Sequence, residues 1–198
     1  MSGLRKDLTT SVLAIIAMTV VLGLLYPLVI TGIAQVVFPG SANGSKVSYN
    51  GHVVGSKLIG QEFKGKAYFQ PRPSATGYSG NVTYFGNGGP NSAEVRDEIR
   101  EELATYVKLN KPYDHSLTRE DVPVDAVTQS ASGVDPHISE ANAQIQAHRI
   151  AAIRHLPLSK VEDLISAHTD GRSLGVLGEP GANVLELNIA LDEEAPIK

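Results

Sequence analysis

The sequence contains no cysteine and, between Asp7 and Lys46, no charged residue. Without cysteine the chain forms neither disulfides nor CxxC metal sites, and this composition suits an oxidising compartment as well as the cytoplasm. The uncharged stretch is overwhelmingly apolar from Val12 to Val37. These residues, about 26 of them at a helical rise of 1.5 Å, span roughly 39 Å, more than the ~30 Å hydrocarbon core of a bilayer. We therefore predict one membrane-spanning helix.

Pro27 lies near the middle of this span. Because proline lacks an amide hydrogen and its ring clashes with the preceding turn, we expect a kink at Tyr26 and Pro27. A cleaved signal peptide is the alternative interpretation, with Arg5 and Lys6 as its basic start. The apolar run continues past Pro27, and residues 33–37 hold no Ala-x-Ala cleavage pattern, so an uncleaved signal anchor fits better.

Basic residues are scarce on both sides of the span. Arg5, Lys6 and the N-terminal amine precede it, whereas Lys46 and Lys57 follow it. This slight bias predicts a cytoplasmic N-terminus, and no second apolar run returns the chain across the membrane. The expected division is a short cytoplasmic N-terminus (1–9), a membrane helix (10–38) and an extracytoplasmic domain (39–198).

The expected outer domain is acidic, which disfavours a nucleic-acid partner. The whole chain carries a formal net charge of −4, and setting aside Arg5, Lys6 and Asp7 leaves about −5 on the rest. No repeat of 20 to 50 residues and no low-complexity tract is present in the sequence. We therefore expect a single folded unit.

Hydrophobic spacing and turn residues predict a small α/β or α+β domain on a membrane stalk. Asn91 with Glu94 resembles a capping box. Ser159 with Glu162 forms another, and Ser139 is a candidate N-cap. Apolar residues alternate over 185–191 with the period of a half-buried strand. The predicted elements are a hairpin within 47–59, strands at 66–69 and 185–191, an extended piece at 122–127, a long loop up to Pro90, and helices starting near Asn91, Ser139 and Ser159.

One polar stretch, residues 128–139, contains hydroxyls, a carboxylate and an imidazole. A serine hydrolase is the sharper hypothesis, but the Gly-x-Ser-x-Gly elbow is absent, and Ser132, Asp135 and His137 are too close in sequence for a relay across a fold. A turn at Asp135 and Pro136 that leads into the Ser139 cap is the simpler interpretation. The chain has no HxxxH spacing, and no Lys-Ser or Lys-Thr follows the glycines at 86–89, which disfavours metal and nucleotide sites.

Arg72 stands between Pro71 and Pro73, which restrict the backbone on both sides. The guanidinium is therefore aimed with little entropy left to lose on binding. Two interpretations carry equal weight from sequence alone. In one, Arg72 docks on a carboxylate of a partner; in the other, it pairs with one of the domain's own acids.

Several short motifs occur along the chain in a specific order. They are YP at 26–27, ANGS at 42–45, GSKLIGQ at 55–61, RPSAT at 72–76, SGVDPHIS at 132–139 and NVLELNIALD at 183–192. The ordered set resembles the C subunit of the bacterial high-affinity potassium-transporting ATPase, the KdpC family. The resemblance implies one span of the bacterial inner membrane, a cytoplasmic N-terminus and a large periplasmic or extracytoplasmic domain.

The resemblance further implies an accessory subunit that itself catalyses nothing. Its partners would be a P-type ATPase subunit (KdpB-like), a channel-like potassium-translocating subunit (KdpA-like) and a small single-span subunit (KdpF-like). ATP and K⁺ would be bound by the complex and not by an identifiable site of this chain. The family is described as a catalytic chaperone that raises ATP affinity and also as a cap near the external potassium entrance. Since ATP is cytoplasmic, an outer domain would act on it only indirectly, through coupling between states of the complex.

The motif residues supply the candidate partner interface. The sequence departs from the family pattern at two places. Residues 84–91 read YFGNGGPN where the family commonly has SGGSN, which weakens any role for that loop, and Gln129 stands where alanine is common. The alternatives to an accessory subunit are a membrane-anchored solute-binding module and a membrane-anchored hydrolase. The candidate interface residues are Tyr26, Pro27, Asn43, Gly44, Ser45, Arg72, Pro73, Ser74, Ser132, Gly133, Asp135 and Pro136.

Overall fold

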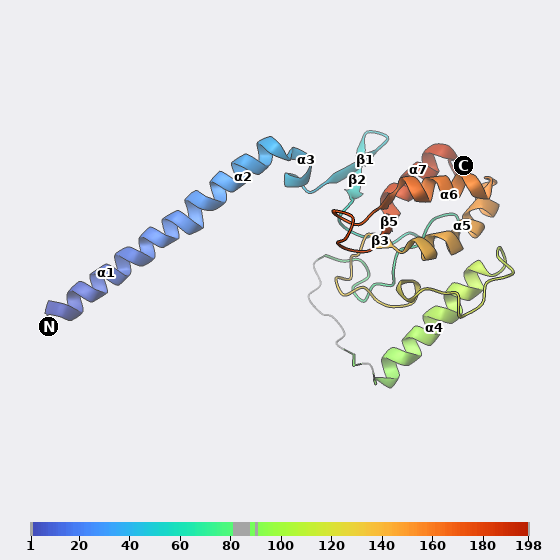
Figure 1. Ribbon diagram of the computed structural model, residues 1–198, viewed down its shortest axis with the longest axis horizontal. Helices are drawn as coiled ribbons and strands as arrows, with labels where there is room; N and C mark the ends of the chain where they lie inside the picture. The colour runs from blue at the N-terminus through green and yellow to red at the C-terminus, as the bar shows by residue number, and fades with distance from the viewer. Residues whose placement is uncertain (1, 81–87, 90, 198) are drawn as a thin grey trace. The chain divides into compact units, whose positions relative to one another are not determined.

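Figure 1 shows the computed structural model, which describes residues 2–80, 88–89 and 91–197. The chain divides into two compact units, with the boundary between Lys46 and Val47. The first unit consists mainly of helix. Its elements are α1 Ser2–Met18, the π-helical stretch η1 Thr19–Leu25, α2 Tyr26–Val37 and the short α3 Pro39–Ala42.

One continuous helical run, Gly3–Val37, is long and apolar enough to cross a bilayer. It has 35 residues, its mean hydropathy reaches 2.6 over its most apolar window, and none of that window is buried inside the chain. Apolar side chains displayed all round a helix are stable in lipid or against other apolar helices, and not in water. The predicted N-terminal apolar helix is confirmed.

The helix changes its hydrogen-bonding pattern just before Pro27. Over Thr19–Leu25 it is π-helical, and the amide of Tyr26 donates to the carbonyl of Val21, five residues earlier. Since the ring of a proline collides with the carbonyl four residues before it, a wider preceding turn relieves the collision. The predicted kink at Tyr26 and Pro27 stays a prediction, and the structure shows this local rearrangement at the same place.

The predicted hairpin is confirmed as β1 Lys46–Tyr49 and β2 His52–Ser56, which form a two-stranded sheet. Asn50 and Gly51 connect the strands with positive φ angles of 50° and 79°. A type I′ turn needs two left-handed residues, and asparagine and glycine tolerate that conformation best. The hairpin therefore follows from its local sequence.

A second sheet joins three very short strands: β3 His137–Ile138, β4 Thr169–Asp170 and β5 Gly181–Asn183. Strand β5 lies in the middle and pairs antiparallel with both neighbours. Ile138 and Thr169 both lie opposite Ala182. The sheet thus fixes the start of the helix that begins at Val184, directly after β5, and both ends of residues 171–180.

Three helices surround the main core: α5 Glu140–Arg154, α6 Leu158–Ala167 and α7 Val184–Glu194. Helix α6 packs against α5 and α7, and α4 Ala93–Asn110 packs against α5 (Figure 1). These helices and the two small antiparallel sheets confirm the expected fold class. The core residues are Phe69, Ile138, Ala143, Ala147, Ile150, Ala151, Val161, Ile165, Ala182, Val184, Leu187 and Leu191.

The strand predicted at 66–69 is wrong, because this segment is irregular. Phe69 is fully buried, and Asn188 of α7 binds its backbone twice, accepting from its amide at 2.8 Å and donating to its carbonyl at 2.9 Å. Gln146 of α5 binds Gln70 in the same way, at 2.8 and 3.0 Å. Amide side chains thus supply the hydrogen bonds that a neighbouring strand would otherwise supply.

The extended piece predicted at 122–127 is also wrong. The segment forms a 3₁₀ turn, η2 Val124–Ala126, because the amide of Val127 donates to the carbonyl of Val124 at 3.2 Å. Ala126 and Val127 then pack with Tyr106 of α4 in a second, smaller apolar cluster. The apolar residues of this segment therefore pack in a buried turn and not in a strand.

The closing strand predicted at 185–191 is wrong as well, since these residues belong to α7. Asn183 caps this helix by accepting an amide hydrogen from its first turn at 3.2 Å. A polar residue within the buried face hides the helical period in the sequence. The buried positions of the helix are Val184, Leu185, Leu187, Asn188 and Leu191.

The predicted helix caps are partly correct. Ser139 caps α5 as expected, and its hydroxyl accepts from the first turn at 3.1 Å. Helix α4 is capped by Ser92, not by Asn91, because the Ser92 hydroxyl accepts from an amide at 3.4 Å. Helix α6 begins after Pro157 without a side-chain cap, so the capping box predicted from Ser159 is wrong. Proline at this position supplies a suitable φ angle instead.

Candidate functional site: a clasp between two loops

Two loops distant in sequence, residues 71–78 and 128–137, meet in the second unit and form what we call the loop clasp. The Nη1 atom of Arg72 lies 3.1 Å from Oδ2 of Asp135, and each side chain is about a quarter exposed. The Nη2 atom also reaches the carbonyl of Gln129 at 3.4 Å. Of the two interpretations open for Arg72, the structure shows the intramolecular ion pair.

Ser74 holds the clasp from its other side. Its hydroxyl donates to the carbonyl of Gly133 at 2.5 Å and accepts from the amide of Tyr78 at 3.0 Å. Gly133 has a φ of 70°, which favours glycine because a Cβ would crowd the backbone there. Pro73 joins in through its carbonyl, which accepts from the amide of Ser130 at 3.2 Å. The candidate residues of the two loops therefore contact one another directly.

A third segment reaches the clasp at Gly60. Its amide donates to the carbonyl of Val134 at 2.7 Å. A Cβ placed on Gly60 would lie 2.4 Å from the carbonyl oxygen of Asp135, so only glycine fits without a backbone shift. Gly60 was not among the candidate residues predicted from sequence, although its place in the GSKLIGQ motif was a signal for it.

The hydrolase alternative fails on geometry at this site. The hydroxyl of Ser132 accepts from the amide of Val134 at 3.2 Å and lies 3.0 Å from the Ser130 hydroxyl. Asp135 binds Arg72 through one oxygen and accepts the backbone amide of His137 through the other, at 3.0 Å. Serine, aspartate and histidine thus form no relay, and the turn predicted at Asp135 and Pro136 is the arrangement observed.

The imidazole of His137 faces a different carboxylate. Its Nε2 atom lies 3.4 Å from Oδ2 of Asp170, at the end of β4. The two residues and the Arg72–Asp135 pair line a cavity of about 320 Å³ beside the second sheet. Within residues 2–80, 88–89 and 91–197, no three His, Asp or Glu side chains gather closely enough to hold a metal ion.

A buried polar network lies next to the clasp and was missed from sequence. Arg149 is fully buried, and its Nε donates to Asn110 Oδ1 at 2.9 Å while its Nη2 donates to Gln146 Oε1 at 2.8 Å. Burial lowers the pKa of Arg149 to about 10. Tyr106 donates to Oδ1 of Asn142 at 2.8 Å, and burial raises the pKa of its phenol. The hydrophobic pattern does not mark Arg149, because arginine counts as a surface residue in such a pattern even where it lies between Ile145 and Ile153 on the apolar face of its helix.

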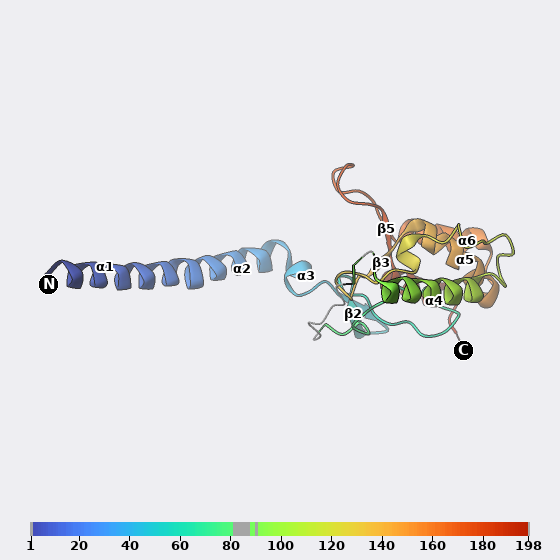
Figure 2. The ribbon, with the colours of Figure 1, turned by 90° about the horizontal axis from the view of Figure 1, so that it is seen from below.

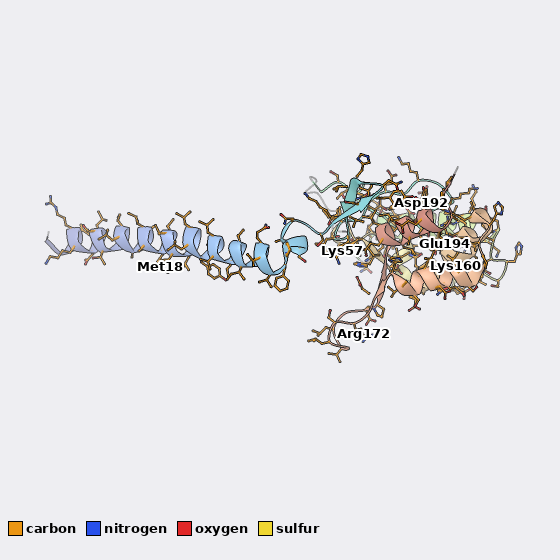
Figure 3. All side chains as sticks on the ribbon, turned by 90° about the horizontal axis from the view of Figure 1, so that it is seen from above. Met18, Lys57, Lys160, Arg172, Asp192 and Glu194 are labelled. Carbon is orange, nitrogen blue, oxygen red and sulfur yellow. The ribbon has the colours of Figure 1, made fainter. Side chains whose placement is uncertain are left out.

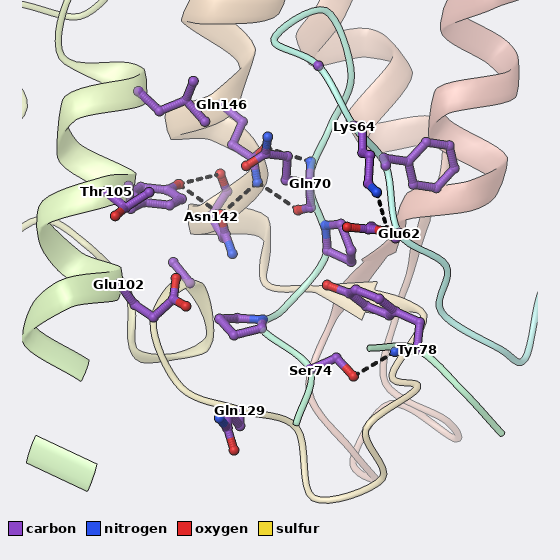
Figure 4. Close-up of a pocket in the computed structure, with 17 residues that line it drawn as sticks. Glu62, Lys64, Gln70, Ser74, Tyr78, Glu102, Thr105, Gln129, Asn142 and Gln146 are labelled. Atoms are coloured by element: carbon purple, nitrogen blue, oxygen red, sulfur yellow. Dashed lines mark hydrogen bonds and ion pairs between the residues drawn. The ribbon is translucent and has the colours of Figure 1, made fainter. Parts of the chain in front are cut away.

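A cleft of about 490 Å³ opens over this network, between α4 and the loops around Gln70 and Ser74 (Figure 4). Gln146 and Asn142 line it, and Figure 4 shows their amides bonded to each other and the Gln146 amide bonded to the Gln70 backbone. The amides of Gln146 and Asn142 already have partners, so this part of the cleft gives the solute-binding alternative little support.

The sequence profile of one family, described as K⁺-transporting ATPase, c chain (KdpC), matches residues 8–193. The chain belongs to the KdpC family. A potassium-transporting ATPase KdpC subunit of Koribacter versatilis is 45% identical over 98% of both chains. The corresponding subunits of Rhodospirillum rubrum and Mycobacterium tuberculosis are 44% and 42% identical, over 97% and 96% of this chain and 98% and 99% of their own. The predicted resemblance is confirmed, and with it the class of protein: a transport-ATPase subunit that is not itself the catalyst.

Three of the ordered motifs that indicated the KdpC family meet in the loop clasp. RPSAT at 72–76 and GSKLIGQ at 55–61, the latter through Gly60, each bind SGVDPHIS at 132–139 through the bonds described above. The YFGNGGPN departure at 84–91 lies mostly outside the described residues. A role of the clasp residues towards a partner stays a prediction.

The other candidate residues belong to the first unit. Tyr26 and Pro27 open α2, and Asn43 follows α3, where its Nδ2 donates to Gln35 Oε1 at 3.1 Å and to the Pro39 carbonyl at 2.7 Å. Gly44 and Ser45 both have positive φ angles, of 89° and 47°. The Asn43 side chain thus fastens the turn that ends the apolar helix, while the partner role predicted for these residues stays a prediction.

Proposed function

We propose that this chain is the accessory, non-catalytic subunit of an ATP-driven potassium import complex. The observation that carries the proposal is the KdpC family match over residues 8–193. Two features of the chain support it. The most apolar window of the helix is not buried within the described residues, and the polar groups of the loop clasp are engaged in holding loops together.

The proposed partners are a P-type ATPase subunit (KdpB-like), a channel-like subunit (KdpA-like) and a small single-span subunit (KdpF-like). The exposed apolar face of Gly3–Val37 is suited to pack against their membrane helices. We infer that the chain spans the bacterial inner membrane with its N-terminus in the cytoplasm and residues 39–198 outside, following the bias of Arg5 and Lys6.

In this orientation, any effect of the outer domain on ATP affinity is indirect. The domain and the nucleotide lie on opposite sides of the bilayer, so the effect must arise because the domain binds one state of the complex more tightly than another. A rigid domain can act in this way, and the loop clasp supplies rigidity. The Arg72–Asp135 and Ser74–Gly133 bonds fasten the loops 71–78 and 128–137 to each other.

The test is to purify the tagged full-length chain in mild detergent from its own membrane after potassium starvation. A P-type ATPase and a large channel-like subunit recovered in fixed ratio would support the proposal. A control purification uses the same tag on an unrelated single-span protein of that membrane. Recovery of the chain alone, monodisperse and stable, would contradict the proposal.

A further inference from the structure

The hairpin β1–β2 and the turn after it, residues 46–59, follow the apolar helix closely, and we call them the juxtamembrane hairpin. The helix ends at Val37, and the chain then folds back on itself, since the amide of Ser45 donates to the carbonyl of Gly40 at 2.9 Å. Lys46 still belongs to the first compact unit. The nine residues that follow Val37 extend to about 30 Å at most, and this fold shortens them. The hairpin therefore begins within reach of the headgroups of any bilayer that the helix crosses.

The juxtamembrane hairpin is basic, whereas the rest of the second unit is acidic. No aspartate or glutamate occurs between Asp7 and Glu62, while Lys46 and Lys57 lie within the hairpin. Residues 62–198 hold 13 lysines and arginines against 20 aspartates and glutamates, a net charge of −7. Neither hairpin lysine pairs with a carboxylate in the part of the chain that the structure describes. Both ammonium groups are therefore available to an anionic surface.

The same hairpin exposes aliphatic side chains. Val53, Leu58 and Ile59 are 62%, 58% and 47% exposed. Figure 2 shows β2 at the edge of the second unit, and Figure 3 labels Lys57, which directly follows this strand. Aliphatic groups are unfavourable in water, and next to a lysine they suit the boundary between phosphates and acyl chains. These side chains therefore gain from a surface outside the chain.

The turn that carries Leu58 and Ile59 is held in place by its backbone. The carbonyl of Lys57 accepts from Nδ2 of Asn183 at 2.7 Å, and the amide of Gly60 is bound in the loop clasp. The main chain is thus fixed on both sides of the two exposed side chains. An ordered turn loses little conformational entropy when its side chains enter another environment. The three side chains of KLI within the GSKLIGQ motif are therefore preorganised for an external contact.

Charge and connectivity together favour phospholipid as what the hairpin contacts. A basic segment with exposed aliphatic side chains, tied closely to a membrane helix, is attracted to anionic phosphates and gains from the apolar layer beneath them. The remainder of the second unit is repelled by the same phosphates because of its net charge of −7. The hairpin is thus the part of the second unit that is suited to the lipid surface.

We propose that the juxtamembrane hairpin lies on the surface of the membrane that the apolar helix crosses. Leu58 and Ile59 enter the boundary between headgroups and acyl chains, and the ammonium group of Lys57 lies against the phosphates of anionic phospholipids. This contact limits how freely the second unit moves on its linker. The inference requires only that Gly3–Val37 crosses the membrane, and it does not depend on the proposed partner subunits.

A matched pair of labelled variants tests the lipid contact in the full-length chain. Since the chain has no cysteine, Leu58→Cys gives a single site for the fluorophore NBD. The labelled chain is reconstituted into phosphatidylcholine and phosphatidylglycerol vesicles that also contain a phosphatidylcholine with a nitroxide near its headgroup. Leu177→Cys is the control, because the two leucines are 58% and 59% exposed and Leu177 lies outside the hairpin.

We expect the nitroxide to quench the fluorescence of the label at Leu58→Cys and not at Leu177→Cys. Equal quenching at the two positions, or none at either, would overturn the inference. The melting temperatures of both variants should match that of the unmodified chain, since both side chains are exposed.

Lys57→Gln, combined with the label at Leu58→Cys, tests the electrostatic part of the contact. It should lower the ratio of lipid-bound to free hairpin by about fivefold, the effect of one lysine near an anionic surface. The fold should be unaffected, because the Asn183 bond uses the carbonyl of Lys57 and not its side chain. Lys64→Gln removes the same charge outside the hairpin and should leave the ratio unchanged. Equal quenching in vesicles with and without phosphatidylglycerol would overturn the inference.

A photo-crosslinker in the native membrane separates lipid from a protein neighbour. Leu58→Cys carrying a benzophenone maleimide is expected to form adducts with phospholipid, identified by mass. Adducts with another membrane protein in place of lipid would overturn the inference and leave the proposed function intact. Lipid adducts on a chain that co-purifies with no transport subunit would instead support the inference while the proposed function fails.

Discussion

Side chains of α5 and α7 bind every carbonyl of the irregular segment 66–70. Arg149 donates to the carbonyls of Lys66 and Tyr68, and Arg154 donates to that of Ala67 at 2.9 Å. Asn188 and Gln146 donate to the carbonyls of Phe69 and Gln70, respectively. Polar side chains buried in the helices thus replace a β-sheet partner, and their desolvation is offset because nearly every donor finds an oxygen.

Gly60 provides a residue-scale prediction about the loop clasp. Gly60→Ala would force a Cβ against the carbonyl of Asp135, so we expect a loss of about 1–3 kcal/mol in the free energy of unfolding, as for other overpacked sites. Thermal unfolding of the full-length chain measures it. Gly171→Ala is the control, since a Cβ there meets nothing within 4 Å. Equal melting temperatures for the two variants would contradict the predicted close approach.

Two tyrosines, the buried Tyr106 and the half-buried Tyr78, predict a loss of stability in alkali. Burial raises the pKa of Tyr78 from its ordinary 10.0 to about 12, and it also raises that of Tyr106. Between these values the unfolded chain has released its phenol protons while the folded chain still holds them, so stability falls as pH rises from about 10 to 12. Arg149 partly opposes this, because its lowered pKa of about 10 makes the folded chain release that proton first.

The alkaline fall in melting temperature should therefore become shallower in Tyr78→Phe, measured from pH 9 to pH 12. Its melting temperature at neutral pH should drop slightly, because the Tyr78 hydroxyl donates to the Arg72 carbonyl at 2.7 Å. Tyr26→Phe, in the apolar helix, is the matched control. An alkaline profile identical in Tyr78→Phe and the unmodified chain would rule out burial of this phenol as a cause.

At the scale of elements, the sequence predicted those helices and strands whose structure depends on residues nearby in the chain. The apolar run at 12–37, the hairpin around Gly51 and the helix capped by Ser139 were predictable because each depends on neighbours in sequence. The strand predicted at 185–191 failed because alternating leucines fit either period, and the buried amide of Asn188 disguised the helical one. The strand predicted at 66–69 failed because the backbone of this segment hydrogen-bonds to side chains of helices far along the chain.

The cap of α7 gives the element-scale prediction. Asn183 is buried, and besides capping the helix its Nδ2 donates to the Lys57 carbonyl at 2.7 Å. Asn183→Ala should lower the free energy of unfolding by about 1–2 kcal/mol for the cap and ~1 kcal/mol more for the unpaired carbonyl. Urea unfolding of the full-length chain in detergent measures this loss.

Ser92→Ala, which removes the longer and more exposed cap of α4, should cost less than Asn183→Ala. Should both alanine variants unfold at the same urea concentration, the second bond of Asn183 would have no measurable effect. The comparison is direct because both residues occupy the same position relative to their helices.

At the scale of the whole molecule, the ordered motifs predicted the family, while the contacts among them were out of reach of sequence. Arg72 and Asp135 are 63 residues apart, and nothing local tells a guanidinium which carboxylate it will meet. The exposed aliphatic turn at residues 174–177 was missed for the opposite reason. Its apolar residues are too few for a periodic pattern, and their exposure becomes evident only once the sheet that carries them is known.

The orientation of the chain is the last prediction, and the lack of cysteine makes it simple to test. Single substitutions Ser2→Cys and Lys160→Cys, one on each side of the apolar helix, are treated in intact cells with a membrane-impermeant maleimide. Lys160 is about two-fifths exposed, so its replacement should be accessible. We expect Lys160→Cys to react at once and Ser2→Cys only after permeabilisation, because Arg5 and Lys6 favour a cytoplasmic N-terminus. The reverse pattern would place the domain beside ATP, and nucleotide contact by the domain would then become the simpler mechanism.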